Sequence, residues 1–201
     1  FQTRWSNLLR FPTTSVLGHS LSVAYFSYLM SVEIGASPKR IYNNTFTGLF
    51  HDLPEVLTRD IISPVKNSVD GISDLIKQCE KEQMDAIVYP LIPEMIKQDI
   101  RHYTENEFDD IVTIDGKIIS TTGDEINEKY NSDTFSPRDG KLVKAADELS
   151  AYIEAYSAIK NGSNIKEFSD ACRNISKKYI EKGSISCINI SRLYESFLID
   201  N

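Results

Sequence analysis

Several features are scarce in this sequence, and each scarcity excludes something. It has three cysteines, Cys79, Cys172 and Cys187, and no CxxC pair, so neither a disulfide framework nor a cysteine zinc site is indicated. No apolar run approaches the roughly 18 to 20 residues that a membrane span needs, and the N-terminal residues do not resemble a secretory signal. We therefore expect a soluble, cytoplasmic protein that has no membrane partner.

Positive charge is also scarce. The chain has 22 basic and 29 acidic residues, a formal net charge of −7, and so no overall attraction for a nucleic-acid backbone. Polymeric nucleic acid is therefore not expected as a partner, although a local basic pocket for a small phosphate stays open. A length of 201 residues with 41% hydrophobic residues suits one globular domain that spans residues 1–201.

The spacing of the apolar residues predicts a largely helical chain. A first long helix is expected to begin after a capping residue in the segment 12–14 and to end at Gly35, and a second to begin at Ser37-Pro38 and run towards His51. A short helix and loop should follow over residues 55–66. Later helices are predicted after Gly71, after Pro93, from 139–140 to 161–162, and around 165–180 and 185–199.

One segment departs from this helical pattern. The β-favouring runs 110–114 and 117–120 are separated by Asp115-Gly116, a dipeptide that suits the type I′ turn of a hairpin. We predict a small inserted β-hairpin near residues 110–120, followed by an irregular polar loop from Thr121 to Arg138.

Two of the three histidines lie where a histidine needs an explanation. His19 falls on the apolar stripe of the first predicted helix, and His51, followed directly by Asp52, lies near the end of the second. Asp147 lies beside the apolar stripe of a later helix, where burial of a carboxylate is costly without a partner. A single histidine on an apolar face is more often an ordinary core residue. Together, however, these two nitrogen and two oxygen donors suit a divalent transition metal.

On these residues the chain resembles the HD-domain metal-dependent phosphohydrolases, and most of all the bacterial HD-type 5′-deoxynucleotidases. The residues that carry the resemblance are Arg4-Trp5, the run 51–60 with Pro64-Val65-Lys66, and the run 142–152. The resemblance implies an all-α helical bundle around one divalent ion, which could be Mn, Co, Fe, Zn, Ni or Mg, and it also implies a homodimer. Its metal ligands would be His19, His51, Asp52 and Asp147.

Two departures from the pattern bear on the substrate more than on the metal. Gly18 stands where those nucleotidases usually carry an acidic residue, and the segment 110–138 is longer than their corresponding connection.

The same resemblance suggests roles around the metal. Glu55 would act as general acid or base towards the leaving 5′ oxygen, and Asp60 would orient the substrate or the attacking water, although these two roles could be exchanged. Arg4 can pair with a phosphate and Trp5 offers a flat apolar surface for a sugar or base. Lys66 could add positive charge near the phosphate. The alternative without a substrate role is that Arg4 is a surface residue beside a core Trp5, and that Lys66 is a solvated loop residue.

We therefore predict a divalent-metal-dependent phosphohydrolase, a 5′-nucleotidase that releases phosphate from (deoxy)nucleoside 5′-monophosphates. One alternative is an HD hydrolase of another phosphorylated small molecule, such as a nucleoside triphosphate or an alarmone. Another is a metal- or nucleotide-binding module without turnover. Glu55 and Asp60 favour the enzyme, because a site that only binds does not require them. His102 is given no site role.

Overall fold

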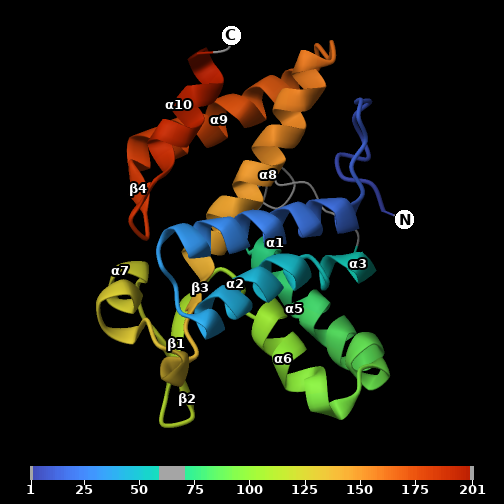
Figure 1. The fold of residues 1–201 in the computed structure, drawn as a ribbon. Coiled ribbons are helices and arrows are strands. Elements are labelled where there is room, and N and C mark those ends of the chain that lie inside the picture. The colour runs from blue at the N-terminus through green and yellow to red at the C-terminus, as the bar shows by residue number, and fades with distance from the viewer. Residues whose placement is uncertain (1, 59–70, 200–201) are drawn as a thin grey trace.

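The computed structural model describes residues 2–58 and 71–199, and Figure 1 shows a bundle of helices with a small sheet at one side. The α-helices are α1 Val16–Glu33, α2 Pro38–Phe50, α3 Glu55–Thr58, α5 Ile72–Gln83, α6 Glu94–Thr104, α7 Gly123–Glu125, α8 Gly140–Lys160, α9 Lys166–Lys182 and α10 Ile190–Ile199. Shorter helical turns are η1 Met84–Val88, η2 Tyr89–Leu91, η3 Ile126–Tyr130 and η4 Asp133–Phe135. The strands are β1 Asp110–Ile114, β2 Lys117–Ser120, β3 Arg138–Asp139, β4 Ser184–Ile185 and β5 Ile188–Asn189. The predicted class, all-α with a small inserted hairpin, is confirmed.

Helices α1 and α2 begin with side-chain caps. The Ser37 side chain accepts a hydrogen bond from the Arg40 N–H, with Pro38 in the first turn, as predicted. In α1 the cap is Ser15, which accepts from the Gly18 N–H and lies one residue beyond the predicted segment 12–14. Both helices thus begin close to where the sequence placed them.

A close approach of α1 and α2 positions the end of α2. A Cβ added at Gly48 would lie 2.9 Å from the Ser27 Oγ and 3.1 Å from the Ala24 Cα, so only glycine permits this packing. His51 follows Gly48 by less than one helical turn. The contact therefore places the end of α2 against the middle of α1.

Helix α8 forms the centre of the core. Its buried apolar side chains include Leu142, Val143, Ala146, Leu149 and Tyr152, which join residues of α1, α9 and α10 in one cluster. Figure 1 shows α8 crossing behind α1 and continuing to α9 and α10, while α5 and α6 lie on the opposite side, beneath α2. None of the helices in the described part of the chain is long and apolar enough to cross a membrane.

The predicted hairpin is present in the predicted register. Ile114 pairs with Lys117, and Asp115 and Gly116 have φ values of 51° and 74°, as a type I′ turn requires. The irregular loop expected from Thr121 to Arg138 is only partly correct, because α7, η3 and η4 occupy much of it and Arg138 belongs to β3, which pairs with β1. Elements of one turn or two residues leave no periodic signal.

The last predicted helix also begins later than expected. A short antiparallel pair, β4 with β5, occupies residues 184–189, and α10 begins only at Ile190. Each of these strands has two residues, so their alternation is too short to be distinguished from the helical pattern that follows.

A buried ion pair connects α2 to the start of α8. The Arg40 guanidinium donates to both carboxylate oxygens of Asp139, at 2.7 and 2.9 Å. The Asn44 side chain donates to the same carboxylate at 3.0 Å and accepts from the Asp139 N–H at 2.8 Å. All three residues are fully buried. This cluster, Arg40–Asn44–Asp139, joins α2 to the residue that precedes α8.

Candidate metal centre

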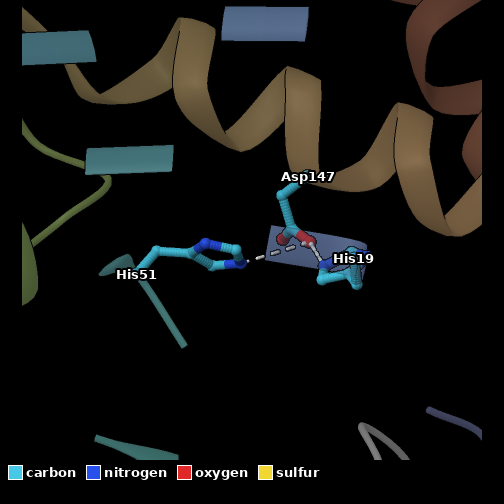
Figure 2. Close-up of side chains that lie close together, drawn as sticks. All are labelled: His19, His51 and Asp147. Atoms are coloured by element: carbon cyan, nitrogen blue, oxygen red, sulfur yellow. Dashed lines mark hydrogen bonds and ion pairs between the residues drawn. The ribbon is translucent and has the colours of Figure 1, made fainter. Parts of the chain in front are cut away.

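Three helices bring histidine and aspartate side chains to one point. Figure 2 shows His19 from α1, His51 at the end of α2 and Asp147 from α8 with their polar atoms facing one another. One ligand atom of each lies within 4.8 Å of the others. The Asp147 Oδ1 is 3.0 Å from the His19 Nε2 and 3.8 Å from the His51 Nε2. This spacing is what a shared metal ion needs.

Asp52, the fourth predicted ligand, lies at the same point. Its Oδ1 is 3.1 Å from the His51 Nε2 and its Oδ2 is 3.8 Å from the His19 Nε2. His19, His51 and Asp52 are all buried, whereas the Asp147 side chain keeps 13% exposure. The structure therefore places all four predicted ligands together, and the side chains of Asp52 and Asp147, at 10% and 13%, are more exposed than those of the two histidines.

Hydrogen bonds orient both imidazole rings. The His51 Nδ1 donates to the Gly48 carbonyl oxygen at 2.8 Å. The His19 Nδ1 lies 3.1 Å from a carboxylate oxygen of Glu154 and 3.1 Å from the Ser150 hydroxyl. With each Nδ1 engaged in this way, each Nε2 faces the centre. Metal-ligating histidines are commonly held by such an outer hydrogen bond.

The donor set fits a divalent transition metal. The His51 Nε2 and the Asp52 Oδ2 are buried, and among the described residues they have ion-pair contacts but no hydrogen bond. Buried polar atoms nearly always have a hydrogen-bond partner, so two such atoms at one point are suited to bind a metal ion. Two imidazole nitrogens with two carboxylates are ligands that such a metal accepts.

Without a metal, the carboxylates hold protons on the histidines. Burial disfavours the charged ring of His19, but hydrogen bonds to Asp147 and Glu154 outweigh it and raise the pKa of His19 to about 9. Burial also lowers the pKa of His51, but its contact with Asp52 and the charges of Asp52 and Asp147 together outweigh burial, so the pKa is raised. In turn, burial raises the pKa of Asp52 less than His51 lowers it, so that this pKa falls to about 2. A metal ion would displace these protons from the rings.

The centre forms part of the wall of a cleft of about 1210 Å³. Arg4 and Trp5 line it, and the Arg4 Nη1 is 4.0 Å from the Asp52 Oδ2. Glu55 lines it at the first residue of α3, where its N–H donates to the Asp52 carbonyl oxygen at 3.1 Å. The predicted residues Asp60 and Lys66 lie outside the described residues.

Two further residues at the centre had no predicted role. Lys144 donates to the Asp147 Oδ2 at 2.8 Å and lies over the Phe108 ring. Glu154 contacts both His19 and Trp5, whose indole N–H donates to it at 2.8 Å. A helical signal for Glu154 does exist in the sequence: it follows Asp147 by seven residues, which places both on one side of α8.

The bundle and its His/Asp centre define a class, and comparison with known proteins identifies that class. The model of the HD domain family matches residues 1–176, so this chain belongs to the HD-domain family.

Named relatives agree with this membership. The chain is 24% identical to a 5′-deoxynucleotidase of Photobacterium profundum over 87% of this chain and 76% of that protein. It is 26% identical to a 5′-deoxynucleotidase of Cronobacter sakazakii over 80% of this chain and 69% of the relative. The crystal structure of an HD-domain phosphohydrolase from Listeria innocua has the same fold, with a TM-score of 0.71 at 16% identity, over 99% of this chain and 82% of the other.

Proposed function

We propose that this protein is a divalent-metal-dependent phosphohydrolase that releases phosphate from (deoxy)nucleoside 5′-monophosphates. The observation that carries the proposal is the convergence of two histidine Nε2 atoms and two carboxylates on the wall of a large cleft. The relatives that are named 5′-deoxynucleotidases support the choice of a monophosphate.

His19, His51, Asp52 and Asp147 are the proposed metal ligands. A divalent cation held there supplies Lewis-acid catalysis for the hydrolysis of a phosphate ester. Two imidazole ligands favour a transition metal over Mg²⁺, which prefers oxygen ligands and retains its water. Mn, Co, Fe, Zn and Ni therefore come before Mg in a screen.

Residues of the cleft perform the remaining tasks. Hydrolysis adds water to phosphorus, breaks the bond from phosphorus to the 5′ oxygen, and transfers a proton to that oxygen. Arg4, which lies beside Asp52 at the metal centre, is positioned to bind the phosphate oxygens. Glu55 on the same wall is the proposed proton donor or acceptor, with Asp60 and Lys66 as further candidates from the sequence. Trp5 borders the space for the sugar or base.

The size of the cleft favours a second candidate substrate class. At about 1210 Å³ the cleft exceeds the roughly 300 to 1,000 Å³ typical of small-molecule sites. A larger phosphorylated molecule, such as a nucleoside triphosphate or an alarmone, would occupy more of it than a monophosphate.

We also propose a homodimer in which a second copy covers the outer face of α1. Six large side chains on this face are exposed: Leu17, Leu21, Tyr25, Tyr28, Leu29 and Val32. Between Val16 and Val32 the helix has no Asp, Glu, Lys or Arg, so the face of one copy does not repel the same face of another. Contiguous apolar patches mark interaction sites, and a two-fold axis pairs identical patches.

The oligomeric state in solution tests this dimer. Leu21→Glu should shift the mass measured by light scattering from dimer to monomer. Leu75→Glu, which alters an equally exposed leucine on α5, should leave a dimer. A wild-type monomer at micromolar concentration would contradict the proposal.

A screen for phosphate release tests the activity. Nucleoside mono- and triphosphates and alarmones are incubated with the protein and each divalent metal, and inorganic phosphate is measured. We expect release from monophosphates that is abolished by a chelator and by His51→Ala or Asp52→Ala. Retained hydrolysis in either variant would remove the proposed centre. A nucleotide-dependent thermal shift without phosphate release under any metal would indicate the binding module instead.

A further inference from the structure

The Glu154 carboxylate lies behind the metal centre and contacts two parts of the site at once. Its Oε1 is 3.1 Å from the His19 Nδ1, and its Oε2 accepts from the Trp5 indole N–H at 2.8 Å. The residue is 7% exposed. One buried carboxylate thus links a metal ligand on α1 with the N-terminal residues that border the cleft.

Positive charges surround this carboxylate and stabilise its ionised form. The Arg4 Nε is 3.9 Å and the Arg10 Nη2 is 3.8 Å from the Glu154 Oε2. The Arg10 Nη1 also donates to the Glu154 carbonyl oxygen at 3.4 Å. A charged carboxylate accepts hydrogen bonds and donates none.

This arrangement determines which nitrogen of His19 faces the metal. An ionised carboxylate at the Nδ1 requires that Nδ1 carry the proton, so the lone pair of the neutral ring is on the Nε2, towards Asp147. The Ser150 hydroxyl also lies 3.1 Å from the Nδ1, but a hydroxyl can donate or accept and therefore imposes no tautomer.

The second oxygen fixes the N-terminal segment. Trp5 has a φ of 57°, in the left-handed region that non-glycine residues rarely adopt. Such a conformation persists only when surrounding contacts determine it. For Trp5 those contacts include the hydrogen bond to Glu154, edge packing on the Phe168 ring at 5.3 Å between centroids, and the hydrogen bond from the Leu8 N–H to its carbonyl oxygen. Arg4 is the preceding residue, and its guanidinium lies beside the same Glu154 oxygen, with the Nε at 3.9 Å.

We propose that Glu154 is a positioning residue that couples metal binding at His19 to the Arg4-Trp5 edge of the cleft. Its effect on nucleotide binding by Arg4 and Trp5 rests on the proposed function. Its coupling of His19 to Trp5 does not. A metal ion that fixes the His19 ring strengthens the contact between His19 and Glu154. Through Glu154 it also changes the surroundings of Trp5. Because coupling between two sites is reciprocal, loss of the contact between Trp5 and Glu154 lowers the affinity for the metal.

The single tryptophan makes this coupling directly measurable. Trp5 is the only tryptophan of the chain, so its emission reports on this one site. The probe is Zn²⁺ alone, added to the metal-free full chain, with emission recorded at each concentration. We expect the emission of the wild type to change and to saturate with metal binding, which is measured independently by competition with a chromophoric chelator.

Glu154→Gln tests the link because glutamine has only one acceptor oxygen. It cannot accept from the His19 Nδ1 and the Trp5 Nε1 on separate oxygens, as the carboxylate does. We expect Zn²⁺ affinity to fall by about 10- to 100-fold, the usual effect of losing an outer partner of a ligating histidine. The metal-dependent change in Trp5 emission should disappear even at saturating Zn²⁺.

Two variants separate coupling from a merely structural role. Ser150→Ala removes the other contact of the His19 Nδ1 but leaves the Trp5 contact, so the emission response should persist. Glu181→Gln makes the same chemical change at an exposed position on α9 and should alter neither affinity nor emission. If Glu154→Gln does not fold, Glu154→Asp, which keeps two acceptor oxygens but is shorter, should show a reduced response.

The outcomes distinguish this proposal from the proposed function. Unchanged Zn²⁺ affinity and an unchanged emission response in a folded Glu154→Gln would overturn the coupling, even if the wild type hydrolyses nucleotides. Absence of phosphate release from the wild type would contradict the proposed function and leave the emission experiment interpretable. Where turnover is observed, Glu154→Gln at saturating metal should also raise the KM for the monophosphate, which a loss of metal alone would not do.

Discussion

Two buried polar clusters meet at α2, one through Arg40 and Asn44 and the other through His51 at its end, and they differ in whether their polar atoms have hydrogen-bond partners. In the Arg40–Asn44–Asp139 cluster the guanidinium, the amide and both carboxylate oxygens have hydrogen-bond partners. In the cluster at the end of α2, the His51 Nε2 and the Asp52 Oδ2 have none among the described residues, although both are buried.

The difference separates structural from functional burial of polar groups. A satisfied cluster stabilises one arrangement of helices, and its loss is a loss of folding free energy. A cluster whose unsatisfied atoms converge on one point has the donors that a bound metal ion needs. The contrast predicts opposite consequences for variants of the two clusters.

The largest expected effect is on activity. Asp147→Asn keeps the shape of the side chain but removes the charge that faces both histidines. Metal catalysis supplies several kcal/mol of transition-state stabilisation, which corresponds to roughly 10³-fold in rate, so kcat/KM for phosphate release should fall by at least that factor. Far-UV circular dichroism and cooperative unfolding should be retained. Activity within tenfold of the wild type would place the reaction elsewhere in the cleft.

A substitution in the Arg40–Asn44–Asp139 cluster should lower stability instead of activity. Arg40→Met leaves the fully buried Asp139 carboxylate without its charged partner, and we expect the free energy of unfolding to fall by about 3 to 5 kcal/mol. Zn²⁺ affinity of the folded fraction should be unchanged. Lys129→Met, which breaks the exposed Lys129–Glu125 ion pair, is the matched control and should show no measurable change. Lost metal affinity at unchanged stability would remove the distinction between the clusters.

The two clusters also differ in how well the sequence predicts them. The four proposed metal ligands could be recognised from local patterns, because each lies on, beside or at the end of an apolar helical stretch, and the structure brings them together. The pairing of Arg40 with Asp139 joins residues 99 positions apart, and nothing near Arg40 indicates its partner. The hairpin was predictable because Asp115-Gly116 specifies its turn locally.

The missed elements have a common physical reason. Strand β3 has two residues and exists because β1 pairs with it across a long loop. The spacing from Asp147 places Glu154 on the same side of α8, but its partners Trp5 and His19 reach it only through tertiary packing. Contacts between distant segments carry no local periodicity, so a pattern in one segment cannot reveal them.

His102 sharpens the contrast, because it has an unpartnered buried Nε2 but belongs to no group of metal ligands among the described residues. Burial and the charges of Arg138 and Lys39 lower its pKa to about 4, against a small opposing effect of Asp99. Above pH 6.5 the ring is neutral in both the folded and the unfolded chain. Below it, the unfolded chain binds a proton that the folded chain excludes, so stability falls as the pH falls towards 4.

The expected loss at His102 is on the order of 3 kcal/mol between pH 6.5 and 4. Urea unfolding at several pH values measures it, and His102→Asn removes the titrating group. The difference in unfolding free energy between wild type and variant should therefore change over this interval and remain constant above pH 7. A difference that did not depend on pH would show that His102 titrates alike in both states.

The smallest expected effect is the stabilisation that the metal itself provides, and it tests whether the two clusters are independent. A ligand that binds only the folded state stabilises it by about 2.7 kcal/mol at one hundred times its Kd. Zn²⁺ at that concentration should raise the unfolding free energy equally in wild type and Arg40→Met, because Arg40 does not contact the metal ligands. In Asp147→Asn the increase should vanish. A smaller increase in Arg40→Met would mean that the satisfied cluster also determines the geometry of the metal centre, since α2 carries both Arg40 and His51.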